Sequence, residues 1–286
     1  MGQFKQNQKL STFYLFLTAF IWGLSFVAQR VGADYMGVFL FNGVRFALGA
    51  FSLIPVILIL ERKRGASRVT LLAGLAGGAV LYIASTLQQF GVEITGSAGR
   101  AGFITGLYTV LVPLLGMLWG RKTSGRAWAG AAAAVVGLYL LSAPDGIQSV
   151  SIGDAVLLSG AFFWAAHIIL VDHFTDRILP LRFSLTQFVV CAALSLISAL
   201  FFEDIQLSVL IAGRVPLLYS GILSVGLAYT LQIFGQRGTP PAKAAVIFSL
   251  EALFSAVGAA VLLGETMEPR GYLGCAFIFL GILLCH

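Results

Sequence analysis

Charged residues are scarce in this chain of 286 residues: Asp, Glu, Lys and Arg make up only 10% of it, and apolar residues make up 58%. A soluble domain of this length could not hide so much apolar surface, so the composition predicts that lipid is the solvent. Basic residues are scattered among short loops and belong to no nucleic-acid-recognition motif, and we therefore predict no nucleic-acid partner.

Enzyme and metal-site motifs are missing as well. The sequence has no Walker loop, no HExxH and no GxSxG, so direct use of ATP and the common hydrolase chemistries are not predicted. The three cysteines, Cys191, Cys275 and Cys285, lie within apolar runs and show no metal spacing. We predict a protein that is not an enzyme and that holds no metal or cofactor.

The chain instead contains ten long apolar runs. A charged residue marks each end of these runs, and the flanking positions are 9–30, 34–61, 68–93, 100–121, 126–145, 154–172, 182–203, 214–237, 243–265 and 270 onward. A bilayer core needs about 20 apolar residues per helix, and a helix satisfies its own backbone hydrogen bonds. The runs are too long and too uniformly apolar for barrel strands. They predict an all-α integral membrane protein with ten transmembrane helices.

The second half of the chain repeats the first. Residues 77–142 align with 221–286 at a shift of 144 without a gap, so that TLQQFG at 86–91 meets TLQIFG at 230–235. Five helices per repeat is an odd number, so the repeats must cross the membrane in opposite directions. Inverted repeats of this kind place a substrate site at the membrane midplane between them. The predicted domains are 13–142 and 153–286.

Basic residues predict the orientation. With the N-terminus inside, thirteen fall in inner segments and four in outer ones. The inner ones are Lys5, Lys9, Arg62, Lys63, Arg64, Arg68, Arg121, Lys122, Arg126, Arg177, Arg182, Arg237 and Lys243, and the outer ones are Arg30, Arg100, Arg214 and Arg270. Because cytoplasmic loops carry the excess of Lys and Arg, we predict a multi-pass protein with both termini in the cytoplasm.

Several short motifs occur along the runs in a specific order. They are AFIWGLSF at 19–26, RF at 45–46, LY at 107–108, PLLG at 113–116, SLEA at 249–252 and LLGE at 262–265, followed by Gly274 and Gly281. Over nearly the whole chain they resemble the EamA type of the drug/metabolite transporter superfamily, although Ala252 stands where many relatives have proline. The resemblance implies two inverted five-helix halves, with helices 1–4 and 6–9 around a central cavity and helices 5 and 10 outside. It also implies export of amino acids, metabolites or drugs, or carriage of nucleotide sugars.

Arg45 and Glu251 are the only formal charges inside the runs. A charge at this depth is costly unless it faces a cavity or a partner, so Arg45 is a candidate anchor for a substrate carboxylate, with a structural arginine as the alternative. Glu251 could carry a proton, bind a cationic group or pair with Arg45; the alternative is a structural acid. His167 could titrate or bind substrate, or it could be a packing residue.

A set of uncharged polar and aromatic residues lies in the helices that the resemblance places around the cavity. They are Trp22, Gln29, Tyr82, Gln88, Gln89, Tyr108, Trp164, Gln187, Tyr229 and Gln232. A buried amide in lipid needs partners, which a cavity supplies through water or substrate and a neighbouring helix supplies directly. We predict that the cavity site consists of Trp22, Arg45, Tyr82, Gln88, Tyr108, Trp164, His167, Gln187, Gln232 and Glu251.

The predicted function is a secondary transporter of the cell membrane that exports a small amphiphilic metabolite, either an amino acid or a drug-like solute. Glu251 is the candidate for proton coupling. The alternatives are a flippase for lipids or lipid-linked sugars, and a facilitative uniporter or exchanger. The predicted partners of the protein are the small-molecule substrate and the bilayer. The sequence does not decide between a monomer and a homodimer.

The topology gives a first prediction. Because of the thirteen-to-four bias of basic residues, an alkaline phosphatase fusion after Cys285 should be inactive and a cytoplasmic reporter at the same position should be active. An active phosphatase fusion would contradict both the orientation and the inverted repeat.

Overall fold

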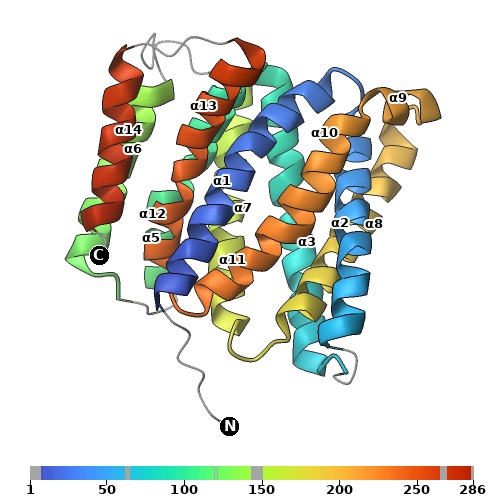
Figure 1. The fold of residues 1–286 in the computed structure, drawn as a ribbon, viewed down its shortest axis with the longest axis horizontal. Coiled ribbons are helices and arrows are strands. Elements are labelled where there is room, and N and C mark those ends of the chain that lie inside the picture. Colours follow the sequence, from blue (N-terminus) through green and yellow to red (C-terminus); the bar gives the residue numbers. More distant parts are fainter. Residues whose placement is uncertain are drawn as a thin grey trace.

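A computed structural model describes residues 8–61, 65–118, 120, 122–142, 151–264 and 269–284. All regular structure within these ranges is helical (Figure 1). Some residues used in the sequence analysis lie outside the described residues: Lys5, Arg62, Lys63, Arg64, Arg121, Asp145, Glu265, Cys285 and His286.

The helices follow one another closely along the chain. They are α1 (Gln8–Ala33), α2 (Val38–Leu60), α3 (Arg68–Thr95), α4 (Ala98–Gly106), α5 (Tyr108–Leu118), α6 (Gly125–Ser142), α7 (Ile152–Phe174), α8 (Pro180–Phe202), α9 (Leu207–Ala212), α10 (Arg214–Leu218), the π-helix η1 (Tyr219–Ala228), α11 (Tyr229–Gln236), α12 (Pro241–Phe248), α13 (Leu250–Leu263) and α14 (Pro269–Leu284).

Within the described residues, eight segments are long and apolar enough to cross a membrane. Five are the single helices α1, α2, α3, α7 and α8, and three join consecutive helices: α4 with α5, α10 with η1 and α11, and α12 with α13. The remaining long helices are α6, with 18 residues, and α14, with 16. The predicted all-helical membrane fold is therefore confirmed, whereas the count of ten spans and the inverted repeat stay predictions.

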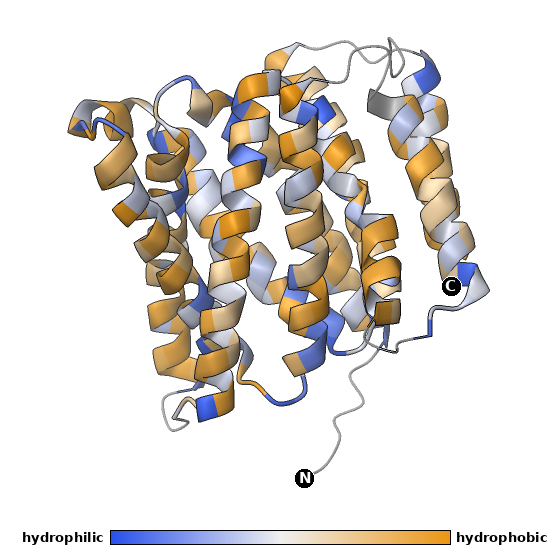
Figure 2. Ribbon diagram, turned by 180° about the vertical axis from the view of Figure 1, so that it is seen from behind, coloured by the Kyte–Doolittle hydropathy of each residue, from blue (hydrophilic) through white to orange (hydrophobic). Residues whose placement is uncertain are grey.

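The outer surface of the bundle is apolar. Hydrophobic residues dominate the length of the helices, and hydrophilic ones gather toward the two ends (Figure 2). Large side chains such as Ile59, Leu118 and Phe201 are each 78% exposed. Exposure of this extent would be costly in water, at about 25 cal/mol per Å² of apolar surface, but it costs nothing in contact with lipid.

Helices from the first half of the chain pack against helices from the second half throughout the bundle. α3 packs against α7 and α8, α2 packs against α8 and η1, and α1 packs against α13, η1 and α11. α6 and α14 form a pair at one edge (Figure 1). The first and second halves of the chain are therefore interleaved and not separate bodies.

Glycines allow α6 and α14 to touch backbone to backbone. A Cβ added to Gly137 would lie 2.5 Å from the carbonyl oxygen of Gly274, and one added to Gly281 would lie 2.6 Å from that of Gly130. The shift of 144 residues converts the first contact into the second. Small residues drive helix association in lipid because they let backbones approach closely.

The C-terminal end of α8 caps the start of α2. Both carboxylate oxygens of Glu203 accept backbone hydrogen bonds, one from Phe39 and the other from Leu40, each at 2.8 Å. The first N–H groups of a helix have no partner within it and carry a partial positive charge, so a carboxylate stabilises them. This contact fixes the start of α2 and with it the level of Arg45, two turns further along.

The glycine contacts predict a specific stability loss. Gly137→Ala should separate α6 from α14, because its methyl group cannot fit against a backbone oxygen at 2.5 Å. We expect a loss of about 1–3 kcal/mol, measured as thermal unfolding of the purified protein in detergent.

Gly99→Ala is the matched control. An added Cβ there meets nothing closer than 4.0 Å, so the change should be neutral or slightly stabilising. Equal behaviour of the two variants would contradict the close α6–α14 contact.

Candidate functional site

A narrow cavity lies inside the bundle. Its lining residues are Trp22, Ser25, Phe26, Gln29, Arg45, Gln88, Thr105, Tyr108, Trp164, Ile168, Ser224, Tyr229, Gln232 and Glu251. All of them except Trp22 are buried, and none of the buried ones is more than 7% exposed. The cavity therefore lies among buried side chains, and its lining comes from both halves of the chain.

One face of α1 supplies four of the lining residues. Trp22, Ser25, Phe26 and Gln29 are spaced three, four and seven positions from the first, which places them on one side of a helix. The indole N–H of Trp22 donates to the carbonyl oxygen of Ser224 in η1 at 3.3 Å. This bond connects the lining of the first half directly to that of the second.

Two transmembrane segments are interrupted next to the cavity. The break between α4 and α5 falls at Leu107, immediately before Tyr108, and the break between α12 and α13 falls at Ser249, two residues before Glu251. The phenolic O–H of Tyr108 donates to Oε1 of Glu251 at 2.8 Å. Interrupted helices are typical of transporter binding sites, because irregular backbone at membrane depth is tolerated where it borders a cavity.

The buried arginine has no polar partner. Arg45 is 2% exposed, and within the described residues its Nε and Nη2 atoms make no hydrogen bond. Its Cζ atom lies 5.4 Å from the ring centroid of Phe41 and 5.1 Å from that of Phe46. Such ring contacts contribute about 0.5–2 kcal/mol, less than the several kcal/mol that a buried guanidinium costs. The donors of Arg45 are available to a ligand.

The cavity glutamines differ in how well they are satisfied. Nε2 of Gln88 donates to Oε1 of Gln29 at 3.0 Å, and Nε2 of Gln89 donates to the backbone oxygen of Gln29 at 3.1 Å, so these three link α1 to α3. Gln232 is 1% exposed, and neither polar atom of its amide has a partner among the described residues. Gln232 therefore resembles Arg45 as a buried polar group without a partner.

Aromatic rings form the apolar part of the lining. Trp22 lies 4.7 Å from Tyr229 and 5.3 Å from Phe248, measured between ring centroids. Trp164 stacks on Tyr229 at 6.0 Å. Such a cluster offers flat apolar surface and a few polar edges, the combination that small-molecule pockets share.

Seven of the ten predicted site residues line the cavity: Trp22, Arg45, Gln88, Tyr108, Trp164, Gln232 and Glu251. Tyr82, His167 and Gln187 are not among its lining residues. Tyr82 shares a hydrogen bond of 2.7 Å with Ser198, and Nε2 of His167 bonds Oε1 of Gln187 at 2.9 Å. These three side chains link neighbouring helices, and their part in transport stays a prediction.

Arg45 and Glu251 line the same cavity, as the sequence analysis expected, but no ion pair within the described residues joins them. Of the two arrangements that the sequence left open, the structure has the shared site and not the direct pair. The lining also contains five residues that the sequence analysis passed over: Ser25, Phe26, Thr105, Ile168 and Ser224. Helical spacing from Trp22 and Tyr108 could have indicated Ser25, Phe26 and Thr105.

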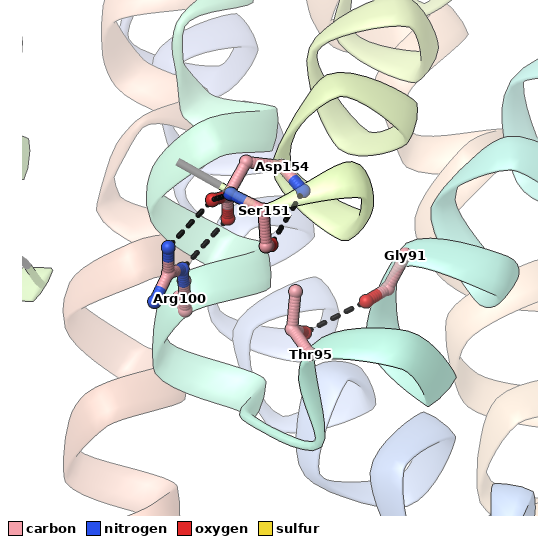
Figure 3. A network of polar contacts seen from close by, with 5 residues as sticks. All are labelled: Gly91, Thr95, Arg100, Ser151 and Asp154. Atoms are coloured by element: carbon pink, nitrogen blue, oxygen red, sulfur yellow. Dashed lines mark hydrogen bonds and ion pairs between the residues drawn. The ribbon is translucent and has the colours of Figure 1, made fainter. Parts of the chain in front are cut away.

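An ion pair joins α4 in the first half of the chain to α7 in the second (Figure 3). Arg100 at the start of α4 bonds both oxygens of Asp154 at the start of α7, at 2.6 and 2.5 Å. Asp154 also forms a capping box with Ser151, which fixes its carboxylate before the arginine binds. Nearby, the hydroxyl of Thr95 donates to the carbonyl oxygen of Gly91 at 2.7 Å.

This geometry predicts a measurable coupling energy. A double-mutant cycle with Arg100→Gln and Asp154→Asn should give about 1 kcal/mol, the upper end for partly exposed pairs, because the contact is bidentate and Asp154 is held in place. Thermal unfolding in detergent measures it.

The pair Arg30–Asp34 serves as the control. Its side chains are 31% and 59% exposed and lie four residues apart at the C-terminal end of α1, so the same cycle should give about 0.3–0.5 kcal/mol. A coupling at Arg100 no larger than this would contradict the prediction.

Known proteins similar to this chain agree with the membrane fold. The model of the EamA-like transporter family matches residues 9–143 and again 151–285. An uncharacterized transporter of Archaeoglobus fulgidus is 30% identical over 275 residues, which cover 94% of this chain and 83% of the relative. A probable amino-acid metabolite efflux pump of Escherichia coli is 28% identical, over 94% of this chain and 92% of the relative.

A solved structure, titled only as the crystal structure of a protein, has the same fold. It superposes with a TM-score of 0.78 at 18% identity and covers 96% of this chain and 95% of its own. With two matches to the family model that together span nearly all of its sequence, the chain belongs to the EamA-like transporter family.

Proposed function

We propose that this chain is a gradient-driven secondary transporter of the cell membrane that exports a small amphiphilic metabolite, with an amino acid as the leading candidate. The observation that carries the proposal is the cavity within the bundle, whose polar and aromatic lining is drawn from both halves of the chain. The name of the E. coli relative, a probable amino-acid metabolite efflux pump, supports the same class of substrate.

Alternating access follows from a site that two interleaved halves share. If the two halves, 13–142 and 153–286, are inverted copies, rocking one against the other exposes the cavity first to one side and then to the other. Interruptions at Leu107 and Ser249 give two of the surrounding segments a point at which to bend.

The driving force comes from a gradient. Movement of one charge across 100 mV is worth about 2.3 kcal/mol, which corresponds to a steady-state ratio of about fifty. Glu251 is the proposed proton carrier, because it is the buried carboxyl group that lines the cavity. In the exchange we propose, Glu251 gives up a proton when the substrate binds and takes one up after the substrate leaves.

Proteoliposomes test this function. With the protein reconstituted in one orientation, a pH gradient should drive accumulation of an apolar amino acid without ATP. Glu251→Gln should keep substrate exchange but lose accumulation driven by the pH gradient, since the amide cannot carry the proton. Glu93→Gln, which removes a carboxyl group at the exposed end of α3, is the control and should behave as the unmodified protein.

The same assay separates the alternatives. A flux that runs only down the substrate gradient in every condition identifies a uniporter or exchanger, and scrambling of labelled lipid identifies a flippase. A strict requirement for ATP would remove secondary transport altogether.

A further inference from the structure

We propose that Arg45 binds the carboxylate of the transported molecule and that Glu251 binds its ammonium group, so that the substrate is an α-amino acid with an apolar side chain. This inference rests on the proposed transport function. It goes further by naming the two groups that a substrate must carry and the residues that bind them.

Arg45 has unused hydrogen-bond donors next to two aromatic rings. Its Cζ atom lies over the rings of Phe41 and Phe46, which contact the cation but offer its N–H groups no oxygen acceptor. Nε and Nη2, the two atoms without partners among the described residues, are a pair that can bind both oxygens of a carboxylate. Arg45 is therefore suited to a planar anion.

Four further lining residues, Ser25, Thr105, Trp164 and Gln232, have donors without partners among the described residues. Within the described residues, neither the indole N–H of Trp164 nor the amide of Gln232 makes a hydrogen bond, although both side chains are at least nine-tenths buried. By contrast, Trp22, Gln88 and Tyr108 all donate to protein acceptors. The unused capacity of the cavity is therefore mainly donor capacity, which an anionic group would use.

Glu251 supplies the opposite charge. It lines the same cavity, and the one hydrogen bond described for its carboxylate comes from Tyr108. Arg45 and Glu251 do not pair within the described residues, so each charge can be neutralised by a ligand that carries both signs. A zwitterion leaves the occupied cavity with no net charge, which is the least costly condition for a site surrounded by lipid.

The aromatic cluster determines what lies between the two charges. Trp22, Trp164 and Tyr229 all line the cavity, and the ring centroid of Tyr229 lies 4.7 Å from that of Trp22 and 6.0 Å from that of Trp164, so the three rings form an aromatic wall. An apolar side chain on the amino acid would contact this wall and be removed from water. A small polar amino acid would leave the rings uncovered and bind less tightly.

Thermal stabilisation of the purified full-length protein tests the proposal. The probes are L-leucine, L-methionine, L-phenylalanine and L-tryptophan, the amide of each, and 3-phenylpropionate. We expect the amino acids to stabilise the protein more than their amides, which lack the carboxylate. Phenylalanine should also exceed 3-phenylpropionate, which lacks the ammonium group.

Variants assign each group to its residue. Arg45→Gln should weaken phenylalanine binding by about tenfold or more and leave phenylalaninamide unchanged, because only the acid uses the charge-assisted bonds. Arg45→Lys should bind phenylalanine with an affinity between those of the unmodified protein and Arg45→Gln, since lysine keeps the charge but cannot bind both carboxylate oxygens in the same way. Glu251→Gln should weaken phenylalanine and leave 3-phenylpropionate unchanged. Arg214→Gln, which changes an arginine outside the cavity, is the control.

Each contrary result would overturn one named part of the proposal. Equal binding of acids and amides, or unchanged phenylalanine binding by Arg45→Lys and Arg45→Gln, removes the carboxylate site. Equal binding of 3-phenylpropionate and phenylalanine removes the ammonium site. If no amino acid binds but a cationic dye is transported without ATP, the inference fails while secondary transport stands. If amino acids bind as expected but no flux occurs in proteoliposomes, the two binding groups stand and the proposed transport function fails.

Discussion

Lipid offers a polar group no hydrogen bond, and the rest of this structure depends on that constraint. Every backbone amide and every polar side chain within the bundle must find a partner inside the protein or border a cavity that supplies one. Helices solve the problem for the backbone. For side chains the solution is visible in cross-helix bonds such as Tyr82 to Ser198 and His167 to Gln187, which tie α3 and α7 to α8. Among the described residues left without partners, Arg45, Trp164 and Gln232 border the same cavity.

The two halves of the chain share their packing but differ in their chemistry. Gly137 against Gly274 and Gly281 against Gly130 are equivalent contacts under the repeat shift, so the edge formed by α6 and α14 is symmetric in detail. Arg45 aligns with Gln187 when the early part of the chain is shifted by 142 residues, yet Arg45 borders the cavity without a partner among the described residues and Gln187 is bonded to His167. Equivalent positions thus share a packing contact at the α6–α14 edge and differ in their polar chemistry.

Hydropathy and the spacing of charges predicted most of the fold, because a membrane span is a property of local composition. The same reasoning located Arg45 and Glu251, since a charge in an apolar run stands out in the sequence. It did not predict the breaks at Leu107 and Ser249 or the π-helix η1. These depend on how neighbouring helices meet, and no local residue pattern encodes them. The sequence also could not show that His167 and Gln187 bond each other, because a buried amide looks the same in sequence whether a neighbouring helix or a ligand satisfies it.

A transport site must be incomplete when empty. If every donor in the cavity had a protein acceptor, substrate would have to break those bonds before it could bind, and differential affinity between occupied and empty states would disappear. If no group had a partner, the empty state would be too costly to form during each return. The cavity lies between these limits, because Tyr108 holds Glu251 and Gln29 holds Gln88, while Arg45, Gln232 and Trp164 keep donors free. In the proposed cycle, substrate would complete the hydrogen bonding that these groups lack, and its departure would restore the same deficit for the next cycle.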